Sequence, residues 1–275
     1  TGGIIEPLPK MQWFIDVKKP VILWGNKQRS IKEILRSVVE SKEIAIIPER
    51  FEKTYFHWID NLRDWCISRQ IWWGHRVPVW YSGENLHVGT QPESKQSIPW
   101  EQDPDTLDTW FSSALWTWST LIDPKLTEDP KLSLVEMLKQ SPDFRAFHPT
   151  SVMETGYDIL FFWVARMILM TTYVGSKFTE KDLSVQDRIP FRTVYLHGLV
   201  RTRDGRKMSK SDPETMIDPL DMISRFGADA LRLSMIVGQS PGNDMRLYAE
   251  KIEGYRNFIN KLWNAARFIL LQCEQ

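Results

Sequence analysis

The chain has 275 residues, of which 42% are hydrophobic, and its 35 Lys and Arg residues balance 35 Asp and Glu residues. These values are those of a globular protein and exclude a disordered or fibrous one. Because the net charge is zero, a globally basic nucleic-acid binder is also excluded, and any contact with nucleic acid must come from local basic patches.

The two cysteines, Cys66 and Cys273, cannot form a disulfide framework, which favours a reducing, cytoplasmic location. No run of 18 apolar residues occurs, and the N-terminus has no basic segment. We therefore expect neither a membrane span nor a signal peptide. The missing initiator Met indicates a fragment or a processed chain. Residues 1–29 carry three prolines between short apolar pieces, which predicts an irregular connector.

Residues 30–81 predict the beginning of an α/β fold. Ser30 is placed to cap a helix with Glu33 three residues on, as in a capping box. The apolar residues that follow have helical spacing, as do those of a second amphipathic helix at residues 51–62. Short β-type runs at residues 44–47 and 77–81 predict strands.

Two polar, turn-rich stretches predict insertions, at residues 82–104 and 123–149. The first is typical of a loop or small hairpin. The second contains a short helix at residues 134–138. Residues 107–121 between them predict one helix.

Residues 150–154 predict a buried strand, residues 158–173 a long apolar helix capped by Asp158, and residues 192–200 a further strand. Strands that alternate with helices predict a parallel sheet. The remaining sequence predicts helices only. Asp218 and Pro219 precede the helices at residues 220–225 and 228–236, and residues 246–272 predict one long helix.

The most basic segment is Arg201 to Lys210, which contains five basic side chains and one acid. It ends in Lys207-Met208-Ser209-Lys210-Ser211. A flexible loop with two lysines around a small hydroxyl residue has the chemistry to neutralise charge on a pyrophosphate leaving group. Taken alone, such a segment is more often a solvated surface loop.

Several motifs carry a family resemblance. Lys207 to Ser211 resembles the signature loop of class I aminoacyl-tRNA synthetases, and Tyr195-Leu196-His197-Gly198 resembles that family's last nucleotide-site strand. Residues 64–75, 107–116 and 154–163 resemble its valyl members in particular, since isoleucyl and leucyl relatives usually differ at Trp72-Trp73 and after Trp110. The resemblance implies an α/β fold: the second half of a Rossmann-like parallel-sheet nucleotide-binding domain, followed by the start of an α-helical bundle.

The resemblance also implies a domain organisation. Residues 1–29 would be the exit of a missing editing insertion, residues 30–217 the C-terminal half of the catalytic domain, residues 218–245 a helical stem-contact region, and residues 246–275 the first helix of the anticodon-binding bundle. The family's His-x-Gly-His element, which belongs to the first half of the nucleotide fold, does not occur in this sequence. We therefore expect the chain to depend on the N-terminal half of the same enzyme.

The function that the resemblance implies is valine–tRNA ligation. The valine carboxylate would attack the α-phosphate of ATP, which enters as a substrate with Mg²⁺, and the valyl-adenylate would then acylate tRNA(Val). No protein nucleophile is required. The histidines and cysteines are scattered without ligand spacing, so no protein-bound metal is predicted.

The resemblance assigns site residues as well. Trp73 and Trp110 would line the amino-acid pocket, where two indole faces sandwich a branched aliphatic side chain, although large aromatic residues more often pack in a core. The residues implied to act on the phosphates are Lys207, Ser209 and Lys210. Those implied to bind ATP or the adenylate are Glu154, Gly156, Asp158, His197, Gly198, Met208 and Lys210.

Alternatives remain for the site and for the chain. Asp158 also fits a helix N-cap, and a lone His such as His197 is more often structural. Asp212-Pro213 replaces the Gly-Asn turn that usually follows the family's loop, which predicts a weakened or reshaped loop. A non-catalytic nucleotide- or RNA-binding module derived from a class I synthetase is the alternative function, ahead of an isoleucyl-type relative or a structural interaction domain.

Overall fold

A computed structural model describes residues 9–93, 98–179, 181–209, 212 and 215–273. The chain forms two compact units. The N-terminal unit comprises Thr1–Met153 and Ile159–Val194. The C-terminal unit comprises Glu154–Asp158 and Tyr195–Gln275.

Helix α1 (Ile31–Glu40) begins as its sequence predicts. The Ser30 hydroxyl accepts the Glu33 backbone N–H at 3.2 Å, and the Glu33 carboxylate accepts the Ser30 backbone N–H at 2.7 Å. This reciprocal capping box confirms the predicted N-terminus. One face of α1 is buried in the core of the N-terminal unit, namely Ile31, Ile34, Leu35, Val38 and Val39.

Strand β4 (Ala45–Ile47) and helix α2 (Arg50–Asp60) follow, also as predicted. Tyr55 of α2 is almost fully buried, and its hydroxyl donates to the backbone carbonyl of Leu35 at 2.8 Å. A phenol that is buried on its apolar side and hydrogen-bonded at its tip holds the two helices together without an unpaired polar group.

The central sheet has the strand order β11 (Thr150–Gly156), β12 (Phe191–His197), β4. The backbone N–H of Thr150 donates to the carbonyl of Pro190 at 3.1 Å. Both strands therefore start at the same end of the sheet, and β11 runs parallel to β12. The predicted α/β class with a parallel sheet is confirmed.

The prediction that β11 is a buried strand is wrong. Ser151 and Val152 are exposed, and only the last two residues of the strand, Thr155 and Gly156, are buried. Among the strands that the structure describes, β11 lies at the edge of the sheet and pairs with β12 alone. A short apolar run in the sequence cannot distinguish an edge strand from a central one.

The predicted apolar helix at residues 158–173 is divided into three helical types. A 3-10 turn (Tyr157–Ile159) leads into a π-helical segment (Leu160–Ala165) and then into α7 (Arg166–Gly175). Among the described residues, the helical stretch Tyr157–Gly175 is long and apolar enough to cross a membrane by length and composition, with a mean hydropathy of 1.3. Half of it is buried, including Met167 and Ile168.

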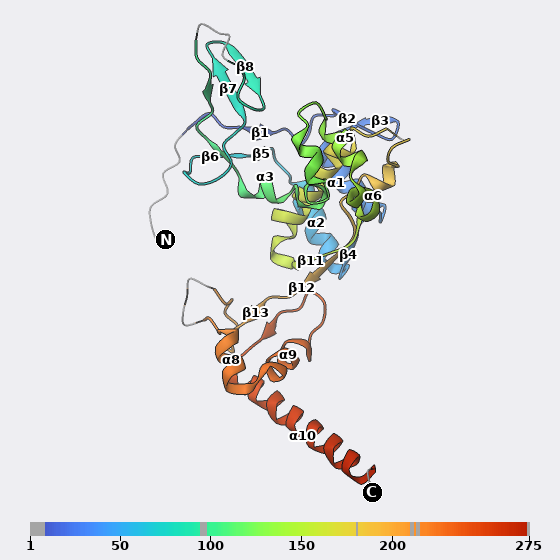
Figure 1. Ribbon diagram of the computed structural model, residues 1–275, viewed down its shortest axis with the longest axis vertical. Helices are drawn as coiled ribbons and strands as arrows, with labels where there is room; N and C mark the ends of the chain where they lie inside the picture. Colours follow the sequence, from blue (N-terminus) through green and yellow to red (C-terminus); the bar gives the residue numbers. More distant parts are fainter. Residues whose placement is uncertain (1–8, 94–97, 180, 210–211, 213–214, 274–275) are drawn as a thin grey trace. The chain divides into compact units, whose positions relative to one another are not determined.

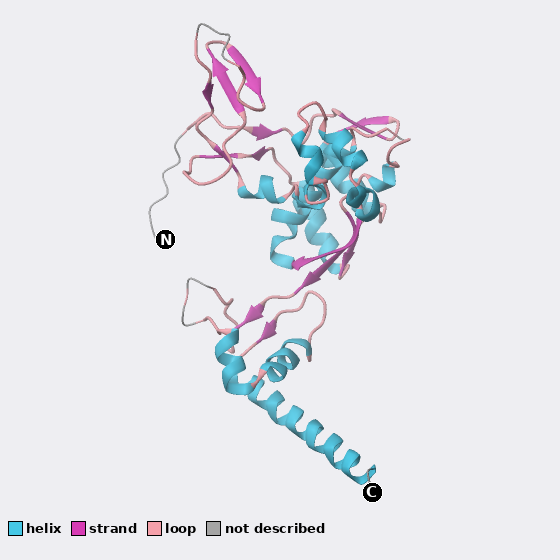
Figure 2. Cartoon of the chain, in the orientation of Figure 1, coloured by secondary structure: helices cyan, strands magenta, loops and turns pink. Residues whose placement is uncertain are grey.

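The first insertion is a small antiparallel sheet. Strand β7 (Val79–Ser82) pairs on one side with β8 (Asn85–Val88) and on the other with β9 (Glu101–Gln102), drawn as magenta arrows in Figure 2. The strand predicted near residues 77–81 therefore exists, but it belongs to this insertion and not to the parallel sheet. Of the β7–β8 hairpin, the second strand β8 falls within residues 82–104, where the sequence suggests a loop or small hairpin.

The single helix predicted for residues 107–121 is wrong. Two short helices, α3 (Thr109–Ser113) and α4 (Trp116–Ser119), take its place. Ser, Thr and Trp dominate this stretch, and these residues have weak helix propensity. The second insertion contains α5 (Leu134–Gln140), close to its predicted position, and α6 (Pro142–Phe147).

Short antiparallel pairs complete the N-terminal unit. They are β1 (Phe14–Ile15) with β5 (Trp65–Cys66), β2 (Ile22–Trp24) with β3 (Lys27–Arg29), and β6 (Ser68–Arg69) with β10 (Thr106–Leu107).

In its described residues, the C-terminal unit combines a strand pair with three helices. β13 (Val200–Arg201) runs parallel to β14 (Met245–Arg246). The helices are α8 (Pro219–Phe226), which the Asp218 carboxylate caps, α9 (Ala228–Ile236) and α10 (Ala249–Cys273). The buried core residues shared by these elements are Met222, Ala230, Met245, Leu247 and Ile252.

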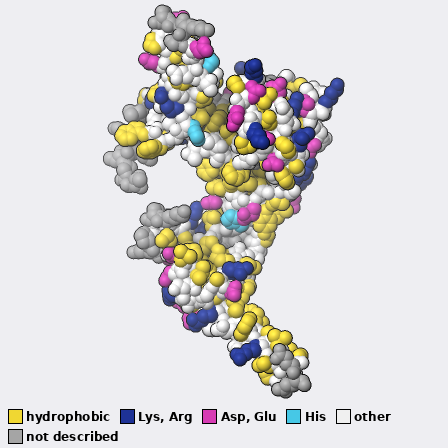
Figure 3. Space-filling model, viewed as in Figure 1, with side chains coloured by type: hydrophobic (Ala, Val, Ile, Leu, Met, Phe, Trp, Pro, Cys, Tyr) yellow, Lys and Arg dark blue, Asp and Glu magenta, His cyan; other side chains and the backbone are white. Residues whose placement is uncertain are grey.

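Helix α10 confirms the long helix predicted for residues 246–272. Its first turns pack against α9 through Ile252. From Phe258 onward it carries large apolar side chains that remain exposed, visible as yellow groups along this helix in Figure 3. They are Phe258, Leu262, Trp263, Phe268, Ile269, Leu270 and Leu271.

Candidate functional site

The C-terminal unit gathers the predicted nucleotide-site residues at the ends of two parallel strands. Glu154 and Gly156 end β11, and His197 ends β12. The His197 Nε2 atom lies 3.5 Å from Glu154 Oε1. The carboxyl ends of parallel strands are where open α/β sheets bind ligands. The two strand ends therefore form one cluster, as the sequence predicts.

The orientation of His197 is set by its own turn. Its Nδ1 atom lies 2.7 Å from the backbone carbonyl oxygen of Gly198, an acceptor. In the neutral imidazole this contact favours the proton on Nδ1, which leaves the Nε2 lone pair directed at the cluster. When the ring is protonated, Nε2 can instead form an ion pair with Glu154.

Gly156 makes room for the Asp158 carboxylate beside this histidine. A Cβ atom at position 156 would lie 2.8 Å from Asp158 Oδ1 and 3.5 Å from His197 Cε1. The first distance is too short for a carbon–oxygen contact. A glycine here therefore lets the Asp158 carboxylate lie against the backbone of the strand end.

Gly198 is required for a different reason. A Cβ atom at position 198 would lie 1.8 Å from the backbone oxygen of Asn243 and 2.1 Å from its carbonyl carbon. These are backbone atoms, so no side-chain rotation can relieve the overlap. The turn after β12 can pack against residues 243–244 only because residue 198 has no side chain.

The basic loop reaches the same cluster. The Lys207 ammonium nitrogen lies 2.8 Å from Asp158 Oδ2, and the two side chains are 58% and 31% exposed. The predicted N-cap role of Asp158 is wrong, because Asp158 lies within the 3-10 turn and Ile159 occupies the N-cap position of the next helical segment. Its carboxylate binds Lys207 instead.

The two residues that follow Lys207 are held within the C-terminal unit. Met208 packs against the apolar core of the C-terminal unit, and the Ser209 backbone N–H donates to the Thr215 hydroxyl at 3.2 Å. The predicted phosphate ligand Lys210, with its neighbour Ser211, lies outside the described residues. The stem of the loop is closed by a β-bridge between Arg201 and Lys207.

Sequence reasoning missed Asp244. Its carboxylate accepts the Leu199 backbone N–H at 2.8 Å, the Tyr157 hydroxyl at 3.0 Å, and a hydrogen bond from Arg201 Nε. Burial raises the pKa of Asp244, but the hydrogen bonds from Leu199, Arg201 and Tyr157 outweigh it and lower the pKa below its ordinary value. In the sequence, this acid follows Gly242-Asn243 and resembles any surface turn.

The predicted amino-acid pocket residues lie in the N-terminal unit. Trp73 is 86% exposed. Trp110 is partly buried in α3, with its ring centroid 6.0 Å from that of Phe162 and 5.9 Å from the Arg166 guanidinium carbon. Of the predicted pair, the Trp110 indole is therefore packed against neighbouring side chains, and the Trp73 indole is exposed to solvent.

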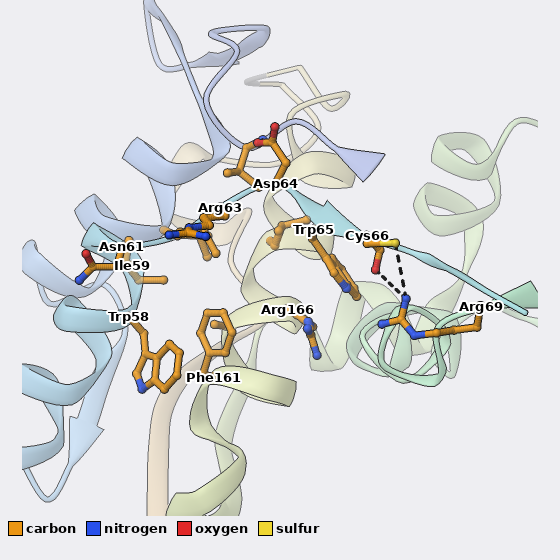
Figure 4. A pocket seen from close by; sticks show the side chains of 15 residues that line it. Trp58, Ile59, Asn61, Arg63, Asp64, Trp65, Cys66, Arg69, Phe161 and Arg166 are labelled. Atoms are coloured by element: carbon orange, nitrogen blue, oxygen red, sulfur yellow. Dashed lines mark hydrogen bonds between the residues drawn. The ribbon is translucent and has the colours of Figure 1, made fainter. Parts of the chain in front are cut away.

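A cavity of about 420 Å³ lies in the same unit. Figure 4 shows Trp58, Phe161, Trp65 and Arg166 directed into it. The Arg166 guanidinium carbon lies 4.4 Å from the Trp65 ring centroid, and burial lowers the pKa of Arg166. Neither Trp73 nor Trp110 lines this cavity. No sequence motif pointed to Arg166, because it follows an uninterrupted apolar run.

Among the described residues, no group of three or more His, Cys, Asp or Glu side chains is arranged to hold a metal ion. The polar groups of the cluster in the C-terminal unit are two carboxylates, an imidazole and an ammonium. Such a set can accept hydroxyl groups and neutralise phosphate charge.

Comparisons with known proteins identify relatives over almost the whole chain. The family described as tRNA synthetases class I (I, L, M and V) matches residues 5–99 and 91–248. The valine–tRNA ligase of Symbiobacterium thermophilum is 48% identical over 98% of this chain and 26% of its own length. That of Bacillus subtilis is 43% identical over 100% of this chain and 27% of its own length. The chain thus spans about a quarter of these curated relatives.

Solved structures share the fold. The ternary complex of Agrobacterium radiobacter LeuRS with tRNA and LeuAMS superposes with a TM-score of 0.55 at 20% identity, covering 74% of this chain and 28% of that one. Mycobacterium tuberculosis methionyl-tRNA synthetase with methionyl-adenylate superposes with a TM-score of 0.52 at 21% identity, covering 80% of this chain and 34% of that one.

Proposed function

The chain belongs to the tRNA synthetases of class I (I, L, M and V), and we propose that it forms the C-terminal half of the catalytic core of a valine–tRNA ligase. The observation that supports this most is the contact of Lys207 with Asp158 beside the ends of β11 and β12. This contact places a basic loop that can bind phosphates next to a carboxylate that can accept the hydroxyls of a ribose.

In the proposed reaction, ATP enters with Mg²⁺ as a substrate. Asp158 accepts the ribose hydroxyls. Gly156 lets the Asp158 carboxylate lie against the strand end, and Gly198 contacts the adenosine from the turn that packs against Asn243. Glu154, His197 and the backbone of Met208 complete the adenosine site. The valine carboxylate attacks the α-phosphate, pyrophosphate leaves, and the adenylate passes its valyl group to a terminal hydroxyl of tRNA(Val).

The residues proposed to act on the phosphates are Lys207, Ser209 and Lys210. Their role is electrostatic, because the charge that builds on the departing pyrophosphate is best stabilised by fixed cations and N–H or O–H donors. The segment that follows departs from the family at Asp212-Pro213. We expect Asp212 to change the conformation at the end of the loop, while Lys207 and Lys210 remain available to the phosphates.

Valine would bind between Trp73 and Trp110. The exposed indole of Trp73 and the supported indole of Trp110 offer two apolar faces to a branched side chain. Asp108 assists by accepting the Trp110 backbone N–H at 3.3 Å, which caps α3.

The rest of the chain has proposed roles as well. Residues 1–29 connect from an editing insertion, residues 30–217 belong to the catalytic domain, residues 218–245 contact the tRNA stem, and residues 246–275 begin the anticodon-binding bundle. Exposed apolar residues on the second half of α10 support this last role, because other helices of a bundle would cover them. The proposed partners are tRNA(Val) and the enzyme's N-terminal half, in the cytoplasm.

Valine-dependent exchange of pyrophosphate into ATP tests the proposal. The full-length protein should catalyse exchange with valine, and Lys210→Ala should lower the rate about a hundredfold by removing one charged stabiliser of the transition state. Lys210→Arg should restore part of the rate. Lys125→Ala, which removes a lysine from the second insertion, is the control and should leave exchange unchanged.

The 275-residue chain by itself should show no exchange, because the proposed reaction needs the N-terminal half. A full-length protein that exchanges with another amino acid in preference to valine would contradict the proposed substrate. A Lys210→Ala variant with a normal rate would contradict the role of the loop.

A further inference from the structure

We propose that Asp244 is a positioning residue for the nucleotide, acting through the strand ends and not on the substrate itself. The proposal rests on the function proposed above. Asp244 lies in the turn before β14, far in sequence from β11 and β12. Its carboxylate nevertheless accepts hydrogen bonds from the segment that follows β11 and from the segment that follows β12.

The three donors to Asp244 come from both sides of the site. Leu199, whose backbone N–H donates at 2.8 Å, immediately follows Gly198. Tyr157, whose hydroxyl donates at 3.0 Å, lies between Gly156 and Asp158. One carboxylate therefore fixes the residue next to each glycine that shapes the cluster.

The third donor extends the connection to the basic loop. Arg201 binds Asp244 through Nε and also donates to the carbonyl of Gly205 at 3.2 Å. Opposite Arg201, across the β-bridge at the stem of the loop, is Lys207. Asp244 thus holds the ribose side and the phosphate side of the proposed site in one network of hydrogen bonds.

Close packing also fixes the turn after β12, in addition to these hydrogen bonds. The backbone of Asn243, the residue before Asp244, lies against Gly198 so closely that no Cβ fits between them. The turn after β12 is therefore held by contact with one residue and by a hydrogen bond to the next. Displacing residues 243–244 would move Gly198, and with it the carbonyl that orients His197.

Asp244 is suited to this role and not to direct contact with ATP. The hydrogen bonds that it accepts lower its pKa, so the group is a carboxylate at neutral pH. A carboxylate beside a triphosphate would repel it unless its charge is matched, and Arg201 matches it here. Its oxygens already accept three donors, so we assign its effect on ATP to those donors.

The test uses the full-length protein with Asp244→Asn, Asp244→Ala and Tyr157→Phe. Asp244→Asn keeps an oxygen that can accept the Leu199 N–H but loses the charge that faces Arg201. We expect Asp244→Ala to raise the KM for ATP about tenfold, Asp244→Asn and Tyr157→Phe to raise it less, and the KM for valine to stay unchanged in all three. ATP binding measured by calorimetry should weaken in the same order.

Asp229→Asn is the matched control. Asp229 also forms an ion pair with an arginine, Arg232, at 3.3 Å, on the exposed surface of α9. This variant should leave both KM values unchanged. A purely structural role for Asp244 would lower the melting temperature or the kcat without a selective rise in the KM for ATP, and that outcome would overturn the inference.

The failures of the two proposals are distinguishable. If wild-type protein shows no valine-dependent exchange, the proposed function is wrong. If wild-type protein exchanges normally and the variants bind ATP as tightly as it does, only the inference about Asp244 is wrong. Should Asp244→Ala fail to fold, Asp244→Asn and Tyr157→Phe still decide the question.

Discussion

The ammonium of Lys207 and the carboxylate of Asp158 form an ion pair of 2.8 Å that joins the basic loop to the end of β11. Both side chains are partly exposed, and exposed ion pairs contribute about 0–1 kcal/mol. A nucleotide that offers hydroxyls to Asp158 and phosphates to Lys207 can therefore replace this pair at little cost. The ion pair therefore places the two proposed ATP-binding groups close together, and ATP can still separate them.

Asp158→Asn should raise the KM for ATP about tenfold, because a charged acceptor for the ribose hydroxyls is lost. With 2′,3′-dideoxy-ATP, which has no such hydroxyls, the variant and the wild type should differ little. The measurement is exchange kinetics with each nucleotide. An equal rise in KM with both nucleotides would show that Asp158 does not bind the ribose hydroxyls.

Gly198→Ala should destabilise the protein by about 1–3 kcal/mol or more, because the new methyl group would overlap the Asn243 backbone. Gly254→Ala is the matched control. Nothing lies within 4 Å of a Cβ at position 254 in α10, so an alanine there should stabilise the helix by up to about 1 kcal/mol. Denaturant unfolding of both variants measures the difference, and a stable Gly198→Ala protein would contradict the described turn.

Trp110→Ala should raise the KM for valine much more than the KM for ATP, because it removes an apolar wall of the proposed amino-acid pocket. Trp80→Ala removes a partly buried indole from the small sheet of the first insertion and serves as the control. Equal effects on both substrates, or loss of stability with both KM values unchanged, would make Trp110 a packing residue.

Stability should fall in mild acid because of His148. Burial lowers its pKa from 6.5 to about 4, and its ring stacks on Phe144 with centroids 4.4 Å apart. Above pH 6.5 neither the folded nor the unfolded state carries the proton. Between pH 6.5 and 4 the unfolded chain binds a proton that the folded one does not, so the free energy of unfolding falls by up to roughly 3 kcal/mol.

His148→Phe keeps a stacking ring and removes the titration, so unfolding followed at several pH values should show a shallower decline for this variant. His57→Gln changes an exposed histidine of α2 and should leave the decline as it is in the wild type. Parallel pH profiles for the wild type and His148→Phe would refute the role of His148.

Elements whose cause is local could be predicted from the sequence. The cap of α1 depends on Ser30 and Glu33, which are three residues apart, and the start of α8 depends on Asp218 and the proline that follows it. Strand pairing depends on distant partners. The strand near residue 79 was predicted correctly, but nothing in its own sequence indicated that it would pair with β8 and β9.

The candidate site divides in the same way. Glu154, His197 and Lys207 stand out because they belong to motifs. Asp244 does not, because its partners Leu199 and Tyr157 are 45 and 87 positions away. Lys210 lies outside the described residues, so its predicted role remains a prediction.

The π-helical segment Leu160–Ala165 affects how the chain tolerates changes of length. A π turn holds about one residue more than an α turn. Deleting one residue within this segment would let it relax to an α-helix, with Met167 and Ile168 still directed into the core. Deleting one residue within α7 would rotate every later side chain by about 100° and turn its buried face outward. Tolerance of deletions should therefore change sharply at Arg166, where one helical type gives way to the other.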